Sequence, residues 1–183
     1  MIKPVSKSDE ATFVRGFKAR CENLAIQFRQ HLKLSEIEPL PAVDLAAYLG
    51  VWIWELDGLP HLTGEAKRHL KSAEGDEWSA VAVRAANQDI IVLNPRHKPP
   101  RQSNDLMHEL AHIILNHQPA QVLVSEAAEI GFRTFDKRQE AEADWLGACL
   151  LLPRPAVAHC HSQAMSVGTA AELFLVSSEL YKF

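Results

Sequence analysis

The sequence has few cysteines and no cysteine pair spaced for metal binding. Cys21, Cys149 and Cys160 are its only cysteines, an odd number without a CxxC pair. Disulfide-stabilised secreted domains and cysteine-based zinc ribbons carry more cysteines in regular patterns. The sequence therefore argues against both classes, and we interpret the three residues as reduced thiols of a cytoplasmic protein.

The sequence also lacks an excess of positive charge and a long apolar run. It has 19 Lys and Arg residues against 23 Asp and Glu residues, for a formal net charge of −4. Proteins that mainly bind nucleic acid are basic, so we expect no direct nucleic acid ligand. No stretch reaches the roughly 18 apolar residues of a membrane span. No apolar segment follows the lysines near the N-terminus, so we expect a protein that is neither exported nor anchored.

Glycine and proline are too scarce and scattered for a low-complexity chain, at 8 and 10 residues. The 47% hydrophobic and 23% charged residues match a globular domain. A chain of 183 residues builds one hydrophobic core without splitting. We therefore predict a single domain over 1–183, with an N-terminal amphipathic helix at 8–33, a core at 40–153 and a C-terminal helical segment at 154–183.

Short β-branched runs and helical patterns alternate within this core. A run at 51–56 predicts a strand, and two runs at 78–84 and 89–93, separated by polar residues, predict a hairpin. The fold class that we predict is α+β, with a small antiparallel three-stranded sheet packed against several helices. Helical periodicity or capping residues predict helices over residues 43–49, 63–72, 103–117 and 137–152, with a capping-box pattern at Thr169.

The predicted helix over 103–117 carries the motif His108-Glu-Leu-Ala-His112. A spacing of four residues places both imidazoles on one face of a helix, about one turn apart, so they can share one metal ion. In this motif Glu109 lies beside the open position of the metal, where it can take a proton from water. The pattern is typical of a metalloprotease.

Two histidines leave a hydrolytic zinc site one protein ligand short. The extended HExxHxxGxxH motif does not supply it, because Leu115 and Gln118 occupy the positions of its glycine and third histidine. The second strong helix offers Glu140, with Glu142 as the alternative. Asp144 shares a face with Glu140 and can accept the second ring N–H of a metal-bound histidine.

At these residues the chain resembles the ImmA/IrrE family of zinc metallo-endopeptidases. In that family an HExxH motif is followed, some tens of residues later, by ExEA[DN] and a Leu-Leu-x-Pro-like end. These elements reappear here at His108–His112, Glu140–Asp144 and Leu151–Pro153, and the resemblance covers about 40–180.

The resemblance implies a zincin-like HExxH helix and a zinc-dependent endopeptidase of the gluzincin kind. The implied Zn²⁺ ligands are His108, His112 and Glu140, with Glu109 as acid and base. Studied members cut transcriptional repressors, so the implied partner is a protein substrate, a helix-turn-helix repressor. The alternative is a non-catalytic binding module, in which zinc only joins two helices and the protein sequesters a regulatory protein.

The sequence leaves some roles unassigned and gives other residues a structural interpretation. The donor that would stabilise an oxyanion is not determined. His117 is interpreted as a partner of the helix C-terminal dipole rather than as a ligand. The strand at 89–93 could offer an exposed edge to an extended substrate. The segment 170–182 has the outline of a helix-turn-helix, but Lys182 is its only basic residue, which argues against DNA binding.

Overall fold

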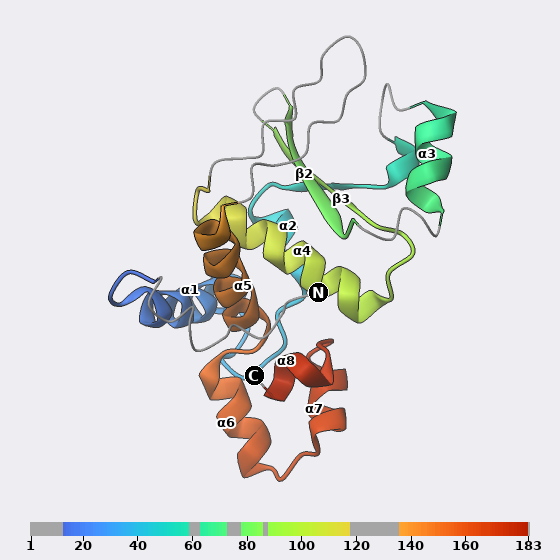
Figure 1. The fold of residues 1–183 in the computed structure, drawn as a ribbon. Coiled ribbons are helices and arrows are strands. Elements are labelled where there is room, and N and C mark those ends of the chain that lie inside the picture. Colours follow the sequence, from blue (N-terminus) through green and yellow to red (C-terminus); the bar gives the residue numbers. More distant parts are fainter. Residues whose placement is uncertain (1–12, 59–62, 73–77, 86–87, 118–135, 183) are drawn as a thin grey trace.

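The computed structural model describes residues 13–58, 63–72, 78–85, 88–117 and 136–182. The fold is α+β (Figure 1). No helix in these ranges has the length and hydropathy needed to cross a membrane. The elements in chain order are α1 (Phe17–His31), α2 (Ala42–Tyr48), β1 (Trp52–Trp54), the 3₁₀ turn η2 (Leu56–Gly58), α3 (Gly64–Lys71), β2 (Ala80–Ala85), β3 (Gln88–Leu93), α4 (Pro99–Ile114), α5 (Lys137–Leu151), α6 (Arg154–Ser162), α7 (Val167–Leu173) and α8 (Ser178–Lys182).

The three strands form a mixed sheet in the order β1-β3-β2. β2 and β3 make the predicted antiparallel hairpin, with Val81 opposite Val92. β1 runs parallel to β3, with Ile53 opposite Ile91, so the predicted fully antiparallel sheet is wrong. A parallel partner needs a long crossover, and the chain between β1 and β3 provides one through α3 and β2. The predicted exposed edge at 89–93 is also wrong, because β3 is hydrogen-bonded on both sides.

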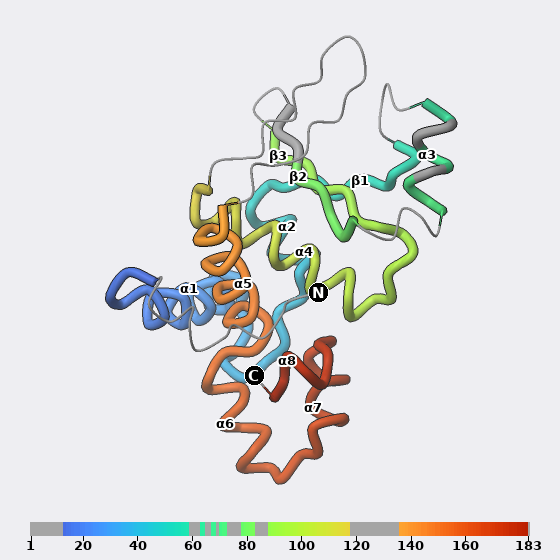
Figure 2. Tube along the Cα trace, viewed as in Figure 1, coloured from blue at the N-terminus to red at the C-terminus, as the bar shows by residue number. Residues whose placement is uncertain are grey.

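Helices α4 and α5 lie in the middle of the molecule, between the sheet and the group α6, α7 and α8 (Figure 1). α4 packs against β2 and β3 on one side and against α5 on the other. α5 in turn packs against α1 (Figure 2). Fully buried apolar residues from these elements form the core, among them Cys21, Ala25, Ile91, Leu106, Leu110, Leu146 and Leu150. The core therefore fixes α4 relative to α5.

Three helices begin or are capped three or more residues away from the predicted position. α1 begins at Phe17, after Gly16 at φ 86°, while residues 8–12 of the predicted helix lie outside the described ranges. α4 begins at Pro99 rather than at 103, because proline suits the first helical positions, where the N–H has no partner in the helix. In α7 the N-cap is Ser166, whose hydroxyl accepts the Thr169 N–H, so the predicted cap at Thr169 is wrong.

The buried Arg29 joins the C-terminal ends of two helices. Its side chain is fully buried, and burial lowers the pKa of its guanidinium to about 10, so it stays charged near neutral pH. It donates hydrogen bonds to the carbonyls of Glu38 at 2.9 Å, Ala25 at 3.2 Å and Leu151 at 3.3 Å. Carbonyls in the last turn of a helix have no partner within that helix, so Arg29 satisfies the Leu151 carbonyl at the end of α5.

Candidate metal centre

Helix α4 presents His108 and His112 toward α5. Leu106 and Leu110 on the same helix are buried in the core, and this burial fixes the rotation of α4 about its axis. The two imidazole rings lie 4.7 Å apart between centroids, and their Nε2 atoms are 3.0 Å apart. The His112 side chain is 8% exposed and that of His108 is 18% exposed, so the pair lies just below the surface.

Helix α5 places a carboxylate opposite this histidine pair. Its N-terminus is capped by Asp136, which accepts the Arg138 and Gln139 N–H groups. One turn into the helix, Glu140 Oε2 lies 3.3 Å from His108 Nε2, and Glu140 Oε1 lies 3.6 Å from His112 Nε2. His108, His112 and Glu140 thus converge, although they come from helices that are separate in the sequence.

The donor atoms of these three side chains fit a shared divalent ion. They all lie within 4.8 Å of one another, and within the described ranges no other group of three donor side chains does so. Bonds of about 2.0–2.1 Å in a tetrahedral site separate the donors by about 3.3 Å. The observed separations of 3.0, 3.3 and 3.6 Å bracket that value. Two imidazoles and one carboxylate also leave a fourth position open, as hydrolytic sites do.

The protonation of Glu140 suits a metal ligand. Burial raises the pKa of its carboxyl, but hydrogen bonds and charge from His108 and His112 hold that pKa well below its usual range. Glu140 is therefore a carboxylate at neutral pH, as ligation requires.

Asp144 contacts the ring nitrogen of His108 that faces away from the shared centre. Its Oδ1 lies 2.9 Å from His108 Nδ1, so Nδ1–H donates to the carboxylate and Nε2 faces the shared centre. Burial lowers the pKa of His108, but hydrogen bonds with Asp144 and Glu140, together with the charge of Glu109, raise it to about 9. Asp144 thus lies where it can fix the orientation of a ligand.

Glu142 points away from the shared centre, unlike Glu140 on the same helix. Its Oε1 accepts a hydrogen bond from Arg138 Nε at 2.8 Å, and its Oε2 lies 3.2 Å from His117 Nε2. His117 Nδ1 lies 2.9 Å from His112 Nδ1. Of the two carboxylates left open by the sequence, the geometry favours Glu140 as the ligand.

Three further histidines in the described ranges do not belong to the cluster. His97 Nδ1 lies 2.8 Å from Asp105 Oδ2, and the two side chains are only 2% and 4% exposed, so His97 anchors the start of α4 rather than facing a substrate. On α6, His159 is half-buried and His161 is exposed, with the buried Cys160 between them. Glu109 is buried at 6% exposure, next to His108 on α4.

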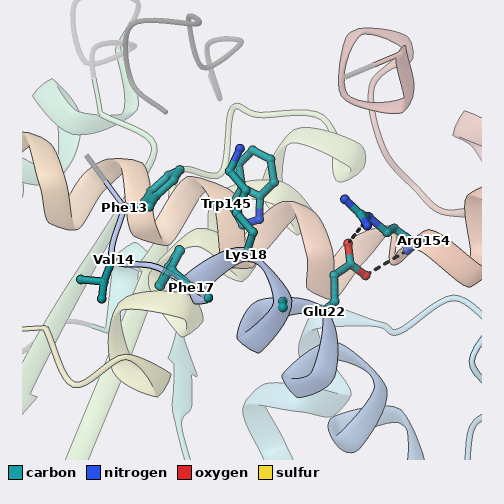
Figure 3. Close-up of a pocket in the computed structure, with 9 residues that line it drawn as sticks. Phe13, Val14, Phe17, Lys18, Glu22, Trp145 and Arg154 are labelled. Atoms are coloured by element: carbon teal, nitrogen blue, oxygen red, sulfur yellow. Dashed lines mark hydrogen bonds and ion pairs between the residues drawn. The ribbon is translucent and has the colours of Figure 1, made fainter. Parts of the chain in front are cut away.

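A hollow of about 410 Å³ lies where Trp145 of α5 meets the start of α1 (Figure 3). Its charged groups contact other residues that line it: Lys18 Nζ lies 3.9 Å from the centroid of the Trp145 ring, and Arg154 pairs with Glu22 at 3.7 Å. None of the residues that line it belongs to the histidine–carboxylate cluster. The hollow therefore belongs to the contact between α1 and α5, not to the candidate site.

Gly147 lets α5 approach α4 closely, and its substitution tests that approach. A Cβ at this position would lie 3.6 Å from His108 backbone atoms, an ordinary van der Waals contact. We expect Gly147→Ala to retain metal affinity and to raise the free energy of unfolding by up to about 1 kcal/mol, since alanine favours helix. Gly147→Leu should push the helices apart and weaken metal binding. Urea unfolding and metal titration measure both effects, and unchanged metal affinity in Gly147→Leu would contradict the requirement for close approach.

Comparison with known proteins assigns the chain to a family. No curated protein matches its sequence. Among solved structures, the fold is similar to that of a Mycobacterium tuberculosis transcriptional regulator, with a TM-score of 0.53 and 12% identity. The alignment covers 94% of this chain and 47% of the regulator, so the chain spans about half of that protein, and the likeness concerns the fold alone. A family model described as Peptidase_M78, IrrE N-terminal-like domain, matches residues 46–183. The chain therefore belongs to this ImmA/IrrE family of metallopeptidases.

Proposed function

We propose that the protein is a cytoplasmic zinc-dependent endopeptidase of the gluzincin kind. The observation that carries this proposal is the convergence of donor atoms from His108, His112 and Glu140 within 4.8 Å of one another. These residues would hold Zn²⁺, and Glu109 follows the first histidine on the same helix. We further propose that 1–183 forms one domain whose catalytic core is 40–153, since both helices of the site lie within that core.

The reaction proposed is addition of water across a peptide bond. When bound, zinc polarises the scissile carbonyl and lowers the pKa of water toward about 7. Glu109 accepts a proton from the attacking water and returns it to the leaving amine, so the hydrolysis balances without a covalent intermediate. Asp144 keeps the His108 ring in the orientation that presents Nε2.

We propose that the substrate is a transcriptional repressor with a helix-turn-helix domain, cut at a specific site. Membership of the ImmA/IrrE family supports a protein substrate. The transcriptional regulator of similar fold is compatible with a role in transcription regulation. The side chains of His108 and Glu140 are 18% and 22% exposed, so the centre is open to solvent.

The direct test is incubation of the full chain with a purified helix-turn-helix repressor, taken from the neighbouring gene where that gene encodes one. We expect discrete fragments when zinc is present, none after chelation, and recovery of cleavage when zinc is returned. Mass spectrometry of the fragments identifies the bond that is cut. A stoichiometric complex of intact chains, formed only with zinc, would contradict the peptidase proposal and favour the zinc-joined binding module.

Zinc binding is expected to release a proton from His108 and therefore to depend on pH. Because the pKa of His108 is about 9 in the metal-free protein, its imidazole is protonated at neutral pH and the metal must displace that proton. Zinc affinity should fall about tenfold for each pH unit below about 9 and level off above it. Competition titrations across this range measure the slope. Asp144→Asn should lower the pH above which zinc affinity stops rising. A zinc affinity that does not change with pH would contradict the release of a proton from His108.

A further inference from the structure

Helix α4 ends in a turn that returns His117 onto the ring of His112. Asn116 adopts a left-handed backbone with φ 54°, and the His117 N–H donates to the His112 carbonyl at 3.0 Å. Asparagine tolerates this conformation better than most residues and sometimes ends helices in this way. The rings of His112 and His117 meet at 5.0 Å between centroids and 70° between planes.

The hydrogen bonds in this turn define where each proton lies. When Nε2 of His112 holds a metal ion, the ring proton is on Nδ1, and Nδ1–H donates to His117 Nδ1, which lies 2.9 Å away. His117 then carries its own proton on Nε2 and donates it to Glu142 Oε2 at 3.2 Å. The other Glu142 oxygen accepts from Arg138 at 2.8 Å. Each group thereby fixes the tautomer of the next.

The burial of His117 and Glu142 distinguishes their contact from a chance contact at the surface. The side chains of His117 and Glu142 are 7% and 12% exposed, so both are held inside the contact between the end of α4 and the first turns of α5. Arg138 is 52% exposed and anchors the outer end of the series. The two histidines of the centre are thus supported differently, since His108 donates directly to Asp144.

We propose that His117 and Glu142 are positioning residues for the metal ligand His112, with His117 as the bridge between that ligand and the carboxylate. This proposal rests on the proposed function, because it takes His112 to be a ligand. Metal-bound histidines generally donate their second ring N–H to a carboxylate, a carbonyl or water, which fixes the ring and raises its basicity. Here a neutral imidazole stands between the ligand and the carboxylate.

The test is zinc affinity and the visible spectrum of the Co²⁺-substituted protein, neither of which requires turnover. His117→Ala is expected to weaken zinc binding about 10- to 100-fold and to change the Co²⁺ spectrum. His117→Asn should recover part of the loss, because its amide oxygen can accept from His112 Nδ1–H. His161→Ala, the same substitution at an exposed position on α6, should change neither readout.

A double-mutant cycle on zinc affinity distinguishes a bridge through His117 from two independent contributions to metal binding. Glu142→Gln alone should weaken zinc binding in the same direction as His117→Ala, and it provides the test if His117→Ala does not fold. Combined, the two changes should cost little more than His117→Ala alone, since both interrupt one series of hydrogen bonds. His117→Ala and Asp144→Asn, which act on different ligands, should be closer to additive.

The outcomes separate this proposal from the function on which it rests. A wild-type protein that binds no zinc would overturn both. Wild-type zinc binding and cleavage, with a His117→Ala variant of unchanged zinc affinity and Co²⁺ spectrum, would overturn the positioning role and leave the peptidase intact. Full additivity of His117→Ala and Glu142→Gln would overturn the bridge.

Discussion

Glu109→Gln is expected to bind zinc normally and to cleave its substrate about 10²- to 10⁴-fold more slowly. Glu109 follows the proposed ligand His108 on α4 and is buried at 6% exposure. Glutamine has nearly the same size, so the packing of α4 should persist, but a side-chain amide does not accept a proton from water near neutral pH. Zinc content of the purified variant and the rate of fragment formation measure the two expectations separately.

The control for this variant is the same substitution at an exposed position. Glu172→Gln on α7 should leave zinc content and cleavage rate unchanged. A wild-type cleavage rate in Glu109→Gln would remove Glu109 from proton transfer. Loss of zinc together with activity would instead show that Glu109 supports the metal centre.

The local elements were predictable where chemistry along the chain determines them. The polar residues between the runs at 78–84 and 89–93 predicted the β2–β3 hairpin, and the structure confirms its antiparallel register. The helix at 137–152 was also predicted, and α5 ends at Leu151, just before Pro153. The parallel pairing of β1 was not predictable, because Trp52–Trp54 is too short to show its direction and its partner lies far along the chain.

The sequence predicted the paired histidines of the candidate site, but it did not determine which of Glu140 and Glu142 lies beside them. A spacing of four residues placed His108 and His112 on one helix face, which required no tertiary information. The choice between Glu140 and Glu142 depends on how α5 crosses α4, and side chains two positions apart point in different directions on a helix. Local patterns do not determine that crossing.

The contact of His117 with His112 was missed for a related reason. The dipole interpretation considered only its position near the end of α4. The contact depends on the left-handed backbone of Asn116, which turns the following residue back toward the helix. Asparagine at a helix end is a weak sequence signal for such a turn. Asn116 was thus the sequence feature that indicated a contact between His117 and His112.

Glu140→Ala is expected to reduce zinc affinity by more than a hundredfold. An apparent binding free energy of about 12 kcal/mol shared by four bonds corresponds to about 3 kcal/mol for each ligand, and about 2.8 kcal/mol is a factor of a hundred. Glu140 carries a carboxylate oxygen 3.3 Å from His108 Nε2, and alanine leaves only the two imidazoles at the centre. Competition with a chelator of known affinity measures the loss.

The comparison variant is Glu142→Ala, which removes a carboxylate two residues away on the same helix. We expect it to weaken zinc binding by no more than about a hundredfold, since it acts through His117 and not on the metal. With excess zinc this variant should recover cleavage, and with excess Co²⁺ its spectrum should keep the form given by three protein ligands. Glu140→Ala should recover neither, because saturation cannot replace a missing ligand. The reverse pattern would make Glu142 the ligand, and the side chains of α5 would then have to rearrange when the metal binds.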